Sequence, residues 1–180
     1  MSEIFFISDH HFGHKNVINF TSDDGSLVRP GYPNIDSMNE FLIDIHNAVV
    51  KPEDTVHFLG DVGWRFDKKL DKILRSLNGK KHLCVGNHDN IKWLAPYFED
   101  AHMWVRFKDH GFMASHVPMN MSDLARGGYN VHGHTHEKVM YKDGTYGSPK
   151  NKFAVSTKHI CVCVEQLDGI PVHIDDLAII

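Results

Sequence analysis

Short apolar runs recur along the chain, and each run ends abruptly in polar residues. The sequence contains five such runs, at residues 4–7, 56–59, 83–85, 112–114 and 129–131. They are short and are bounded by Gly, Asp or Asn, which is typical of buried strands rather than of helices. The pattern therefore predicts five strands before residue 132.

A second, helical spacing separates some of these strands. Apolar side chains at intervals of three and four predict a helix at 35–49, another at 66–77 and a shorter one at 91–98. Ser37 and Glu40 predict a capping box at the start of the first helix, and Gly79 is expected to end the second.

The C-terminal part of the chain lacks helical spacing. From Phe153 onward, apolar residues alternate in a pattern typical of strands, with a turn predicted at 167–169. Strands with helices first, then strands alone, predict an α/β protein with a mixed sheet. Because no repeat or linker interrupts the chain, we expect one domain, residues 1–180.

Composition narrows the classes of function. The formal net charge of −4 argues against an extended nucleic-acid surface. Basic residues between 65 and 92 alternate with Asp67 and Asp71, which favours a solvated helix face over a nucleic-acid groove. The sequence has three cysteines without Cys-x-x-Cys spacing, and no run long enough to span a membrane. We therefore expect a cytoplasmic protein without a membrane partner.

Polar residues with metal-binding side chains follow each of the five predicted strands. Open α/β sheets bind their ligands at the carboxyl ends of strands, so we expect these side chains to converge. The 15 histidines of the chain make metal ligation the first hypothesis. The candidate metal ligands are Asp9, His11, Asp61, Asn87, His116, His134 and His136.

The ligand types indicate the kind of metal site. Oxygen and nitrogen donors without thiolate suit Mn, Fe or Zn and differ from a typical structural zinc site. If Asp61 bridges, the seven ligands divide as four and four between two ions, an arrangement used for phosphoester hydrolysis with ions about 3.5–4 Å apart. The alternative is a set of hydrogen-bonded polar residues at strand ends. That alternative would leave several buried Asp and His side chains without compensation.

The five polar segments, in their order and spacing, resemble the motifs of the calcineurin-like metallophosphoesterases. The resemblance spans residues 1–137, and the opening SDHHFGHKN is similar to a small single-domain subgroup of bacteria and phages. It implies a four-layer α-β-β-α sandwich. The matching segments are Asp9-x-His11, Gly60-Asp61, Gly86-Asn87-His88-Asp89, Ser115-His116 and Gly133-His134-Thr135-His136.

The resemblance also implies a role for each residue. One ion would be held by Asp9, His11 and His136, the other by Asn87, His116 and His134, and Asp61 would be shared. The implied cofactors are two divalent ions, Mn, Fe, Zn or Ni, with a hydroxide between them as nucleophile. His88 would stand beside the scissile phosphate, where it would stabilise charge or protonate the leaving oxygen.

One feature departs from the protein-phosphatase branch of that family. Those members carry a second Asp soon after the Gly-Asp motif, and it orients the catalytic His. Here Val62, Gly63 and Trp64 follow Asp61, so the group that orients His88 is not evident. A protein-phosphatase role is disfavoured for the same reason.

Three further residues are singled out by their positions. His14 and Arg29 are candidates for contact with the substrate phosphate, because a guanidinium suits bidentate binding of phosphate. Support of a metal ligand is the alternative for His14, and a surface position is the alternative for Arg29. His132 is expected to be a strand-end histidine with a hydrogen-bond partner rather than a ligand.

The functional prediction is hydrolysis of a phosphodiester or phosphomonoester. The expected partner is a small phosphoester substrate, with nucleotides among the candidates. The alternatives are a nuclease acting on single-stranded or cyclic-phosphate ends, and a non-catalytic protein-binding relative of the same fold. The last alternative expects missing ligands, and none of the seven is missing.

Overall fold

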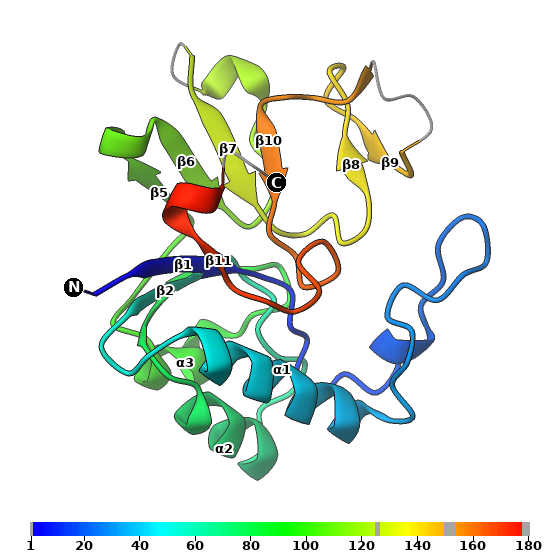
Figure 1. The fold of residues 1–180 in the computed structure, drawn as a ribbon, viewed down its shortest axis with the longest axis vertical. Coiled ribbons are helices and arrows are strands. Elements are labelled where there is room, and N and C mark those ends of the chain that lie inside the picture. Colours follow the sequence, from blue (N-terminus) through cyan, green and yellow to red (C-terminus); the bar gives the residue numbers. More distant parts are fainter. Residues whose placement is uncertain (1, 125–126, 150–153, 178–180) are drawn as a thin grey trace.

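Two β-sheets lie face to face at the centre of the protein (Figure 1). The structure is a computed structural model that describes residues 2–124, 127–149 and 154–177. Residues 1, 125–126, 150–153 and 178–180 of the predicted domain, Phe153 among them, lie outside the described residues.

The first sheet has five strands in the order β11-β1-β2-β3-β4. Strands β1 to β4 run parallel, and β11 is antiparallel to β1. Three of the five apolar runs found in the sequence form strands of this sheet, namely β1, β2 and β3. The strands are β1 (Ile4–Ile7), β2 (Thr55–Phe58), β3 (Lys80–Cys84), β4 (Asp100–His102) and β11 (Val172–His173).

The second sheet has four strands in the order β10-β7-β6-β5. Here β6, β7 and β10 are parallel, and β5 is antiparallel to β6. A short antiparallel hairpin forms a separate two-stranded sheet. The strands are β5 (Trp104–Phe107), β6 (Phe112–Ser115), β7 (Tyr129–His132) and β10 (His159–Cys161), and the hairpin strands are β8 (Val139–Met140) and β9 (Tyr146–Gly147).

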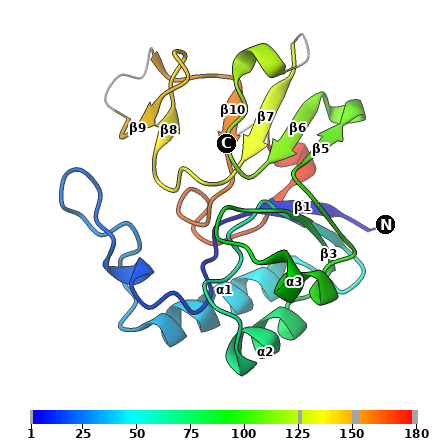
Figure 2. The ribbon, with the colours of Figure 1, turned by 180° about the vertical axis from the view of Figure 1, so that it is seen from behind.

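The α-helices gather on the outer face of the first sheet, as both views show (Figures 1 and 2). They are α1 (Ile35–Val49), α2 (Lys68–Ser76) and α3 (Ile91–Leu94), with a 3-10 turn at Ala95–Tyr97 after α3. The other 3-10 turns in the described residues are Val17–Asn19, Lys108–His110, Met121–Asp123 and Ile174–Asp176.

Two apolar cores follow from this stacking. Phe5 and Ile7 of β1 pack with the helices, whereas Phe6 packs between the sheets with Phe112 and Val131. Successive strand residues point to opposite faces, so one strand contributes to both cores. The continuous apolar runs of the sequence are therefore strands that are buried on both faces.

The mixed α/β class is confirmed, but a second helical layer is not found among the described residues. The connections from β6 to β7 and from β7 to β10 carry Pro118, Gly127 and Gly144 instead of helical apolar spacing. Such residues favour turns. They form a 3-10 turn and the β8–β9 hairpin, so the layer order within the described residues is α-β-β.

Two of the edge strands, β4 and β5, were not predicted. Residues of β4 are exposed, and β5 alternates exposed and half-buried residues with Trp104 open to solvent. Edge strands lack the apolar run that marks a central strand. The C-terminal segment was predicted as strand throughout, and this is wrong at Ile174–Asp176, which form a 3-10 turn. None of the described helices has the length and hydropathy that a membrane span requires.

The predicted capping box at the start of α1 is also wrong. The N-cap is Asn34, whose side-chain oxygen accepts hydrogen bonds from the backbone N–H groups of Asp36 and Ser37 at 2.9 and 3.0 Å. Ser37 already lies inside the helix, so its hydroxyl is not the cap. Asp67 caps α2 in the same way.

We expect Asn34→Ala to lower the free energy of unfolding by about 1 kcal/mol, because the first-turn N–H groups of α1 would lose their acceptor. Ser37→Ala is the matched control and should cost clearly less. Urea denaturation followed by circular dichroism measures both. A larger loss for Ser37→Ala than for Asn34→Ala would restore the capping-box interpretation.

Candidate metal centre

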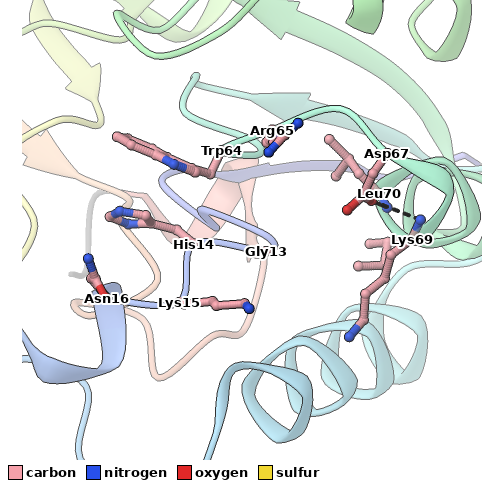
Figure 3. Close-up of a pocket in the computed structure, with 10 residues that line it drawn as sticks. Gly13, His14, Lys15, Asn16, Trp64, Arg65, Asp67, Lys69 and Leu70 are labelled. Atoms are coloured by element: carbon pink, nitrogen blue, oxygen red, sulfur yellow. Dashed lines mark hydrogen bonds between the residues drawn. The ribbon is translucent and has the colours of Figure 1, made fainter.

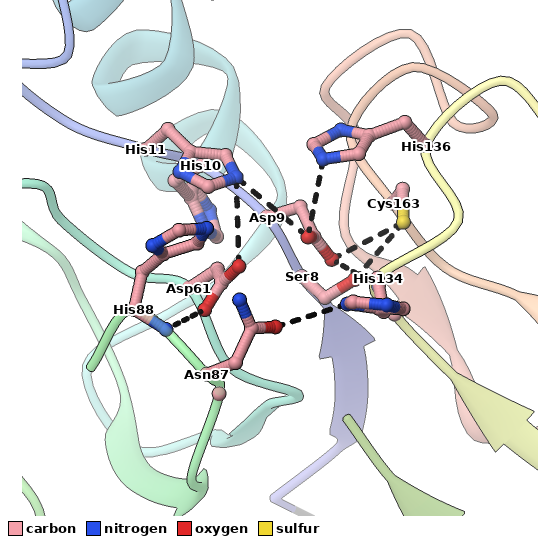
Figure 4. A network of polar contacts seen from close by, with 12 residues as sticks. Ser8, Asp9, His10, His11, Asp61, Asn87, His88, His134, His136 and Cys163 are labelled. Atoms are coloured by element: carbon pink, nitrogen blue, oxygen red, sulfur yellow. Dashed lines mark hydrogen bonds and ion pairs between the residues drawn. The ribbon is translucent and has the colours of Figure 1, made fainter. Parts of the chain in front are cut away.

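The segments after β1, β2, β3 and β7 meet at one place (Figure 4). The segment after β6 brings His116 to the same place, 3.5 Å from Asp61. These loops carry the residues that the sequence singled out. The parallel direction of β1–β3 and of β6–β7 is the reason, because the carboxyl ends of parallel strands lie at the same edge of a sheet.

The backbone of this region adopts a costly conformation. Six non-glycine residues of the described chain have positive φ angles, and five of them are candidate ligands. Such angles cost of the order of 1–3 kcal/mol each and persist where the surroundings enforce them, often at functional sites. The five candidate ligands are Asp9 (φ 60), His11 (φ 52), Asp61 (φ 52), His134 (φ 69) and His136 (φ 52).

Asp9, His11 and His136 form the first group. His11 Nε2 lies 3.8 Å from Asp9 Oδ1, and His136 Nε2 lies 3.7 Å from the same oxygen. One ligand atom from each residue fits within a mutual distance of 4.8 Å. An ion placed between these atoms would reach each of them with a metal–nitrogen or metal–oxygen bond of about 2.0–2.2 Å.

Asp61 lies between this group and the second one. Its Oδ2 atom is 3.7 Å from His11 Nε2 and 3.5 Å from His116 Nε2. On the far side, Asn87 Oδ1 is 2.8 Å from His116 Nε2 and 3.0 Å from His134 Nδ1. The four predicted donors of the second site are therefore adjacent.

Asp9 also lies close to a ligand of the second group, which was not predicted from the sequence. Besides the first group, it belongs to a second buried trio with Asp61 and His116 whose ligand atoms lie within 4.8 Å of one another. Its Oδ2 accepts hydrogen bonds from the backbone N–H of His134 at 2.9 Å and from Cys163 Sγ at 3.2 Å. Burial raises the pKa of the Cys163 thiol, so this thiol stays protonated and donates.

Buried atoms in the first group lack partners within the described chain. Asp9 Oδ1 and His11 Nε2 are both buried without a hydrogen bond. Burial, together with the charge of Arg29, lowers the pKa of His11, which keeps the imidazole neutral as metal ligation requires. Because buried polar atoms are nearly always paired, these side chains fit a cation.

Two glycines permit the close approach of the loops. A Cβ atom at Gly133 would lie 2.5 Å from Asp9 Oδ2, and one at Gly86 would lie 2.3 Å from Asp61 Oδ1. No side chain fits at such distances, so glycine is required at both positions.

The acidic residue of the third motif ties two loops together. The Asp89 carboxylate accepts backbone hydrogen bonds from Gly86 at 2.8 Å, Asp61 at 3.0 Å and Val62 at 2.9 Å. It thereby fixes Asp61 relative to the loop that carries Asn87. The sequence motif contained Asp89 but did not indicate this role.

Glu165 is a site residue that the sequence prediction missed. Its Oε1 lies 2.8 Å from His136 Nδ1, so it fixes the ring that directs Nε2 toward Asp9. Burial lowers the pKa of His136, but the hydrogen bond and charge of Glu165 outweigh it and raise the pKa to about 9. The only signal was a lone acidic residue directly after the apolar run at 161–164.

The structure corrects the expectation for Arg29. It is 5% exposed, so it is not a surface residue. Its Nε donates to Glu165 at 2.7 Å, its Nη1 donates to the His10 carbonyl at 2.9 Å, and its Nη2 donates to the Asp9 carbonyl. These buried partners occupy the guanidinium, which argues against contact with a substrate phosphate. Arg29 instead holds the first motif against Glu165.

His14 and His88 lie at the rim of the centre. The His14 ring stacks on Trp64 at 3.9 Å and lies 5.9 Å from the His11 ring. The exposed His88 ring lies 5.7 Å from His11 and 5.2 Å from Trp64, and its backbone N–H donates to Asp61 Oδ1 at 2.9 Å. Among the described residues, aromatic rings pack against the His88 ring, and no carboxylate forms a hydrogen bond with that ring. Contact of His14 with substrate stays a prediction.

His132 lies apart from the ligands. It ends β7 and is buried, and its Nδ1 lies 2.8 Å from the Gly133 carbonyl. The chain then changes direction, because His134 and His136 have positive φ angles. Because the strand ends at His132, the side chain of His132 does not share one face with those of His134 and His136, although the three residues stand at alternate positions.

We expect Glu165→Gln to weaken divalent-metal binding by about 10–100-fold, because partners that orient a ligating His typically contribute that much. Calorimetric titration with Mn²⁺ measures the affinity, and the melting temperature of the metal-free protein reports folding separately. Glu53→Gln, at an exposed position outside the site, is the control. Unchanged affinity in Glu165→Gln would remove this residue from the metal centre.

The chain is similar in sequence to a protein of known sequence but uncharacterized function. No family model matches the chain. It is 32% identical over 177 residues to the uncharacterized protein MJ1445 of Methanocaldococcus jannaschii, and the match covers 97% of this chain and 89% of that protein. The chain belongs to the family of MJ1445.

Solved structures extend this likeness. The protein of unknown function AQ665 from Aquifex aeolicus matches with a TM-score of 0.69 and 25% identity, over 98% of both chains. A more distant structure, described as a novel archaeal phosphodiesterase, has a TM-score of 0.43 and 21% identity over 95% of this chain and 90% of that one. The second score is too low to support a statement about fold or activity.

Proposed function

We propose that the protein is a phosphoesterase of the calcineurin-like type that uses two divalent metal ions to hydrolyse a phosphodiester or phosphomonoester. The observation that carries the proposal is the position of Asp61. One carboxylate oxygen of this buried residue lies 3.7 Å from His11 Nε2 and 3.5 Å from His116 Nε2, between the two groups of donors.

Each of the two groups of donor side chains would hold one ion. Asp61 would be shared, and the buried, unpartnered Asp9 Oδ1 and His11 Nε2 support the first position. Donors of oxygen and nitrogen suit Mn, Fe, Zn or Ni. When bound, such ions supply positive charge to phosphoryl oxygens and acidify water. The proposed ligands are Asp9, His11 and His136 on one side, Asn87, His116 and His134 on the other, and Asp61 between them.

His88 would act on the substrate directly. Its ring is exposed at the rim and lies 5.2 Å from the ring of Trp64. Its backbone N–H is fixed to Asp61 Oδ1, so the imidazole stands close to the centre without being a ligand. From there His88 would donate a proton to the leaving oxygen or stabilise charge on the phosphoryl group.

The substrate is proposed to be a small phosphoester. A panel of p-nitrophenyl phosphate and bis-p-nitrophenyl phosphate, assayed on metal-stripped protein with added Mn, Fe, Zn or Ni, tests the proposal. We expect turnover of at least one ester that depends on added metal and disappears with chelator. Protein that binds two ions per chain but hydrolyses neither ester nor any nucleotide with any metal would contradict the proposal.

A further inference from the structure

A pocket of about 480 Å³ opens beside His14 (Figure 3). Its walls are the loop after β1, the loop after β2 and the first turns of α2. It adjoins the metal centre through two ring contacts, because Trp64 and His14 line the pocket and lie 5.2 Å from His88 and 5.9 Å from His11, respectively.

Trp64 gives this pocket an aromatic wall. Its indole is 46% exposed, although large apolar side chains are mostly buried. One face stacks on His14 at 3.9 Å with an interplanar angle of 27°, which holds the indole in place. An exposed and preorganised indole is a surface on which a nucleobase stacks.

The pocket also concentrates positive charge in a chain whose net charge is −4. Lys15 and Arg65 line it, both are exposed, and neither forms an ion pair with any described residue. Lys69 is paired with Asp36. The one lining carboxylate, Asp67, accepts hydrogen bonds from backbone N–H groups as the cap of α2. Two unpaired cations therefore face the pocket.

We propose that this pocket is a nucleotide subsite, in which Trp64 stacks on a base and Lys15 and Arg65 bind a phosphate other than the scissile one. The inference rests on the proposed function and narrows the substrate to a nucleotide phosphodiester that carries a second phosphate. Simple alkyl or aryl phosphates would leave the subsite unused. Cationic side chains with an aromatic platform are the combination that binds nucleic-acid units without sequence preference.

Calorimetric titration with thymidine 3′,5′-bisphosphate and with thymidine 5′-monophosphate tests the subsite directly. The wild-type protein should bind the bisphosphate about tenfold more tightly, and Arg65→Gln and Lys15→Gln should each remove most of this difference, since a charge-assisted bond to phosphate would be lost. Trp64→Leu should weaken both probes. Lys72→Gln, at an exposed position of α2 outside the pocket, is the matched control.

Turnover measurements distinguish the proposed nucleotide subsite from the proposed phosphoesterase activity on which it rests. For Arg65→Gln, kcat/KM should fall at least about tenfold more for a 5′-phosphorylated thymidine dinucleotide than for the dinucleotide without that phosphate. Wild-type-like binding of the bisphosphate by both charge variants would overturn the subsite, even if bis-p-nitrophenyl phosphate is hydrolysed. Selective bisphosphate binding without hydrolysis of any phosphodiester or phosphomonoester would support the subsite and contradict the proposed activity.

Discussion

Asp61→Ala should lower phosphoesterase turnover to the background rate and release bound metal in the same step. Asp61 is 2% exposed, its Oδ2 lies between His11 and His116, and its Oδ1 accepts the backbone N–H of His88. The substitution therefore removes a carboxylate oxygen that lies between His11 and His116, and it removes a hydrogen bond that positions His88. Metal analysis after desalting and turnover of bis-p-nitrophenyl phosphate measure the two losses together.

Two companion variants sharpen this experiment. Asp61→Asn keeps the shape and a hydrogen-bond acceptor but loses the charge, so it should also release metal while remaining folded by circular dichroism. Asp109→Ala removes an exposed carboxylate outside the site and should retain metal and turnover. Retention of two ions and of turnover in Asp61→Ala would exclude the shared-ligand assignment.

His88→Ala should retain the metal ions but lose about 10²–10⁴-fold in kcat, the range typical of a general acid. The reason is its place, since the ring is exposed at the rim and packs at 5.7 Å from His11 and 5.2 Å from Trp64. If His88 protonates the leaving oxygen, the loss should be smaller for p-nitrophenyl esters, whose leaving group needs no proton, than for alkyl esters. Comparison of kcat for the two kinds of ester measures this.

The control for His88 is His110→Ala, an exposed histidine of a 3-10 turn outside the metal centre. It should leave kcat and metal content at wild-type values. Equal losses for aryl and alkyl esters in His88→Ala would rule out the acid role and favour stabilisation of charge. Release of metal by His88→Ala would make His88 a ligand instead.

The sequence predicted those parts of the fold that depend on local signals. Central strands such as β1 are buried on both faces, so their apolar runs end sharply where the polar loop begins. The helix at Ile35–Val49 carries its own periodicity, and its bounds match α1. The candidate ligands were also found locally, because each follows such a strand within a few residues.

The remaining features depend on contacts between distant segments. Glu165 reaches His136 and Arg29 only after β10 has been added beside β7, and no short motif records that meeting. Arg29 was misassigned for the same reason, since its buried partners are carbonyl groups and a distant carboxylate. Edge strand β4 was missed because solvent-exposed residues need no apolar pattern.

The central claim is that side chains from separate strand ends hold two cations around Asp61. The most direct test is the metal content of the protein after reconstitution with excess Mn²⁺ and removal of free ions by desalting. We predict two equivalents per chain in the wild type and a loss of both in Asp61→Ala. One equivalent or less in the wild type would contradict the account.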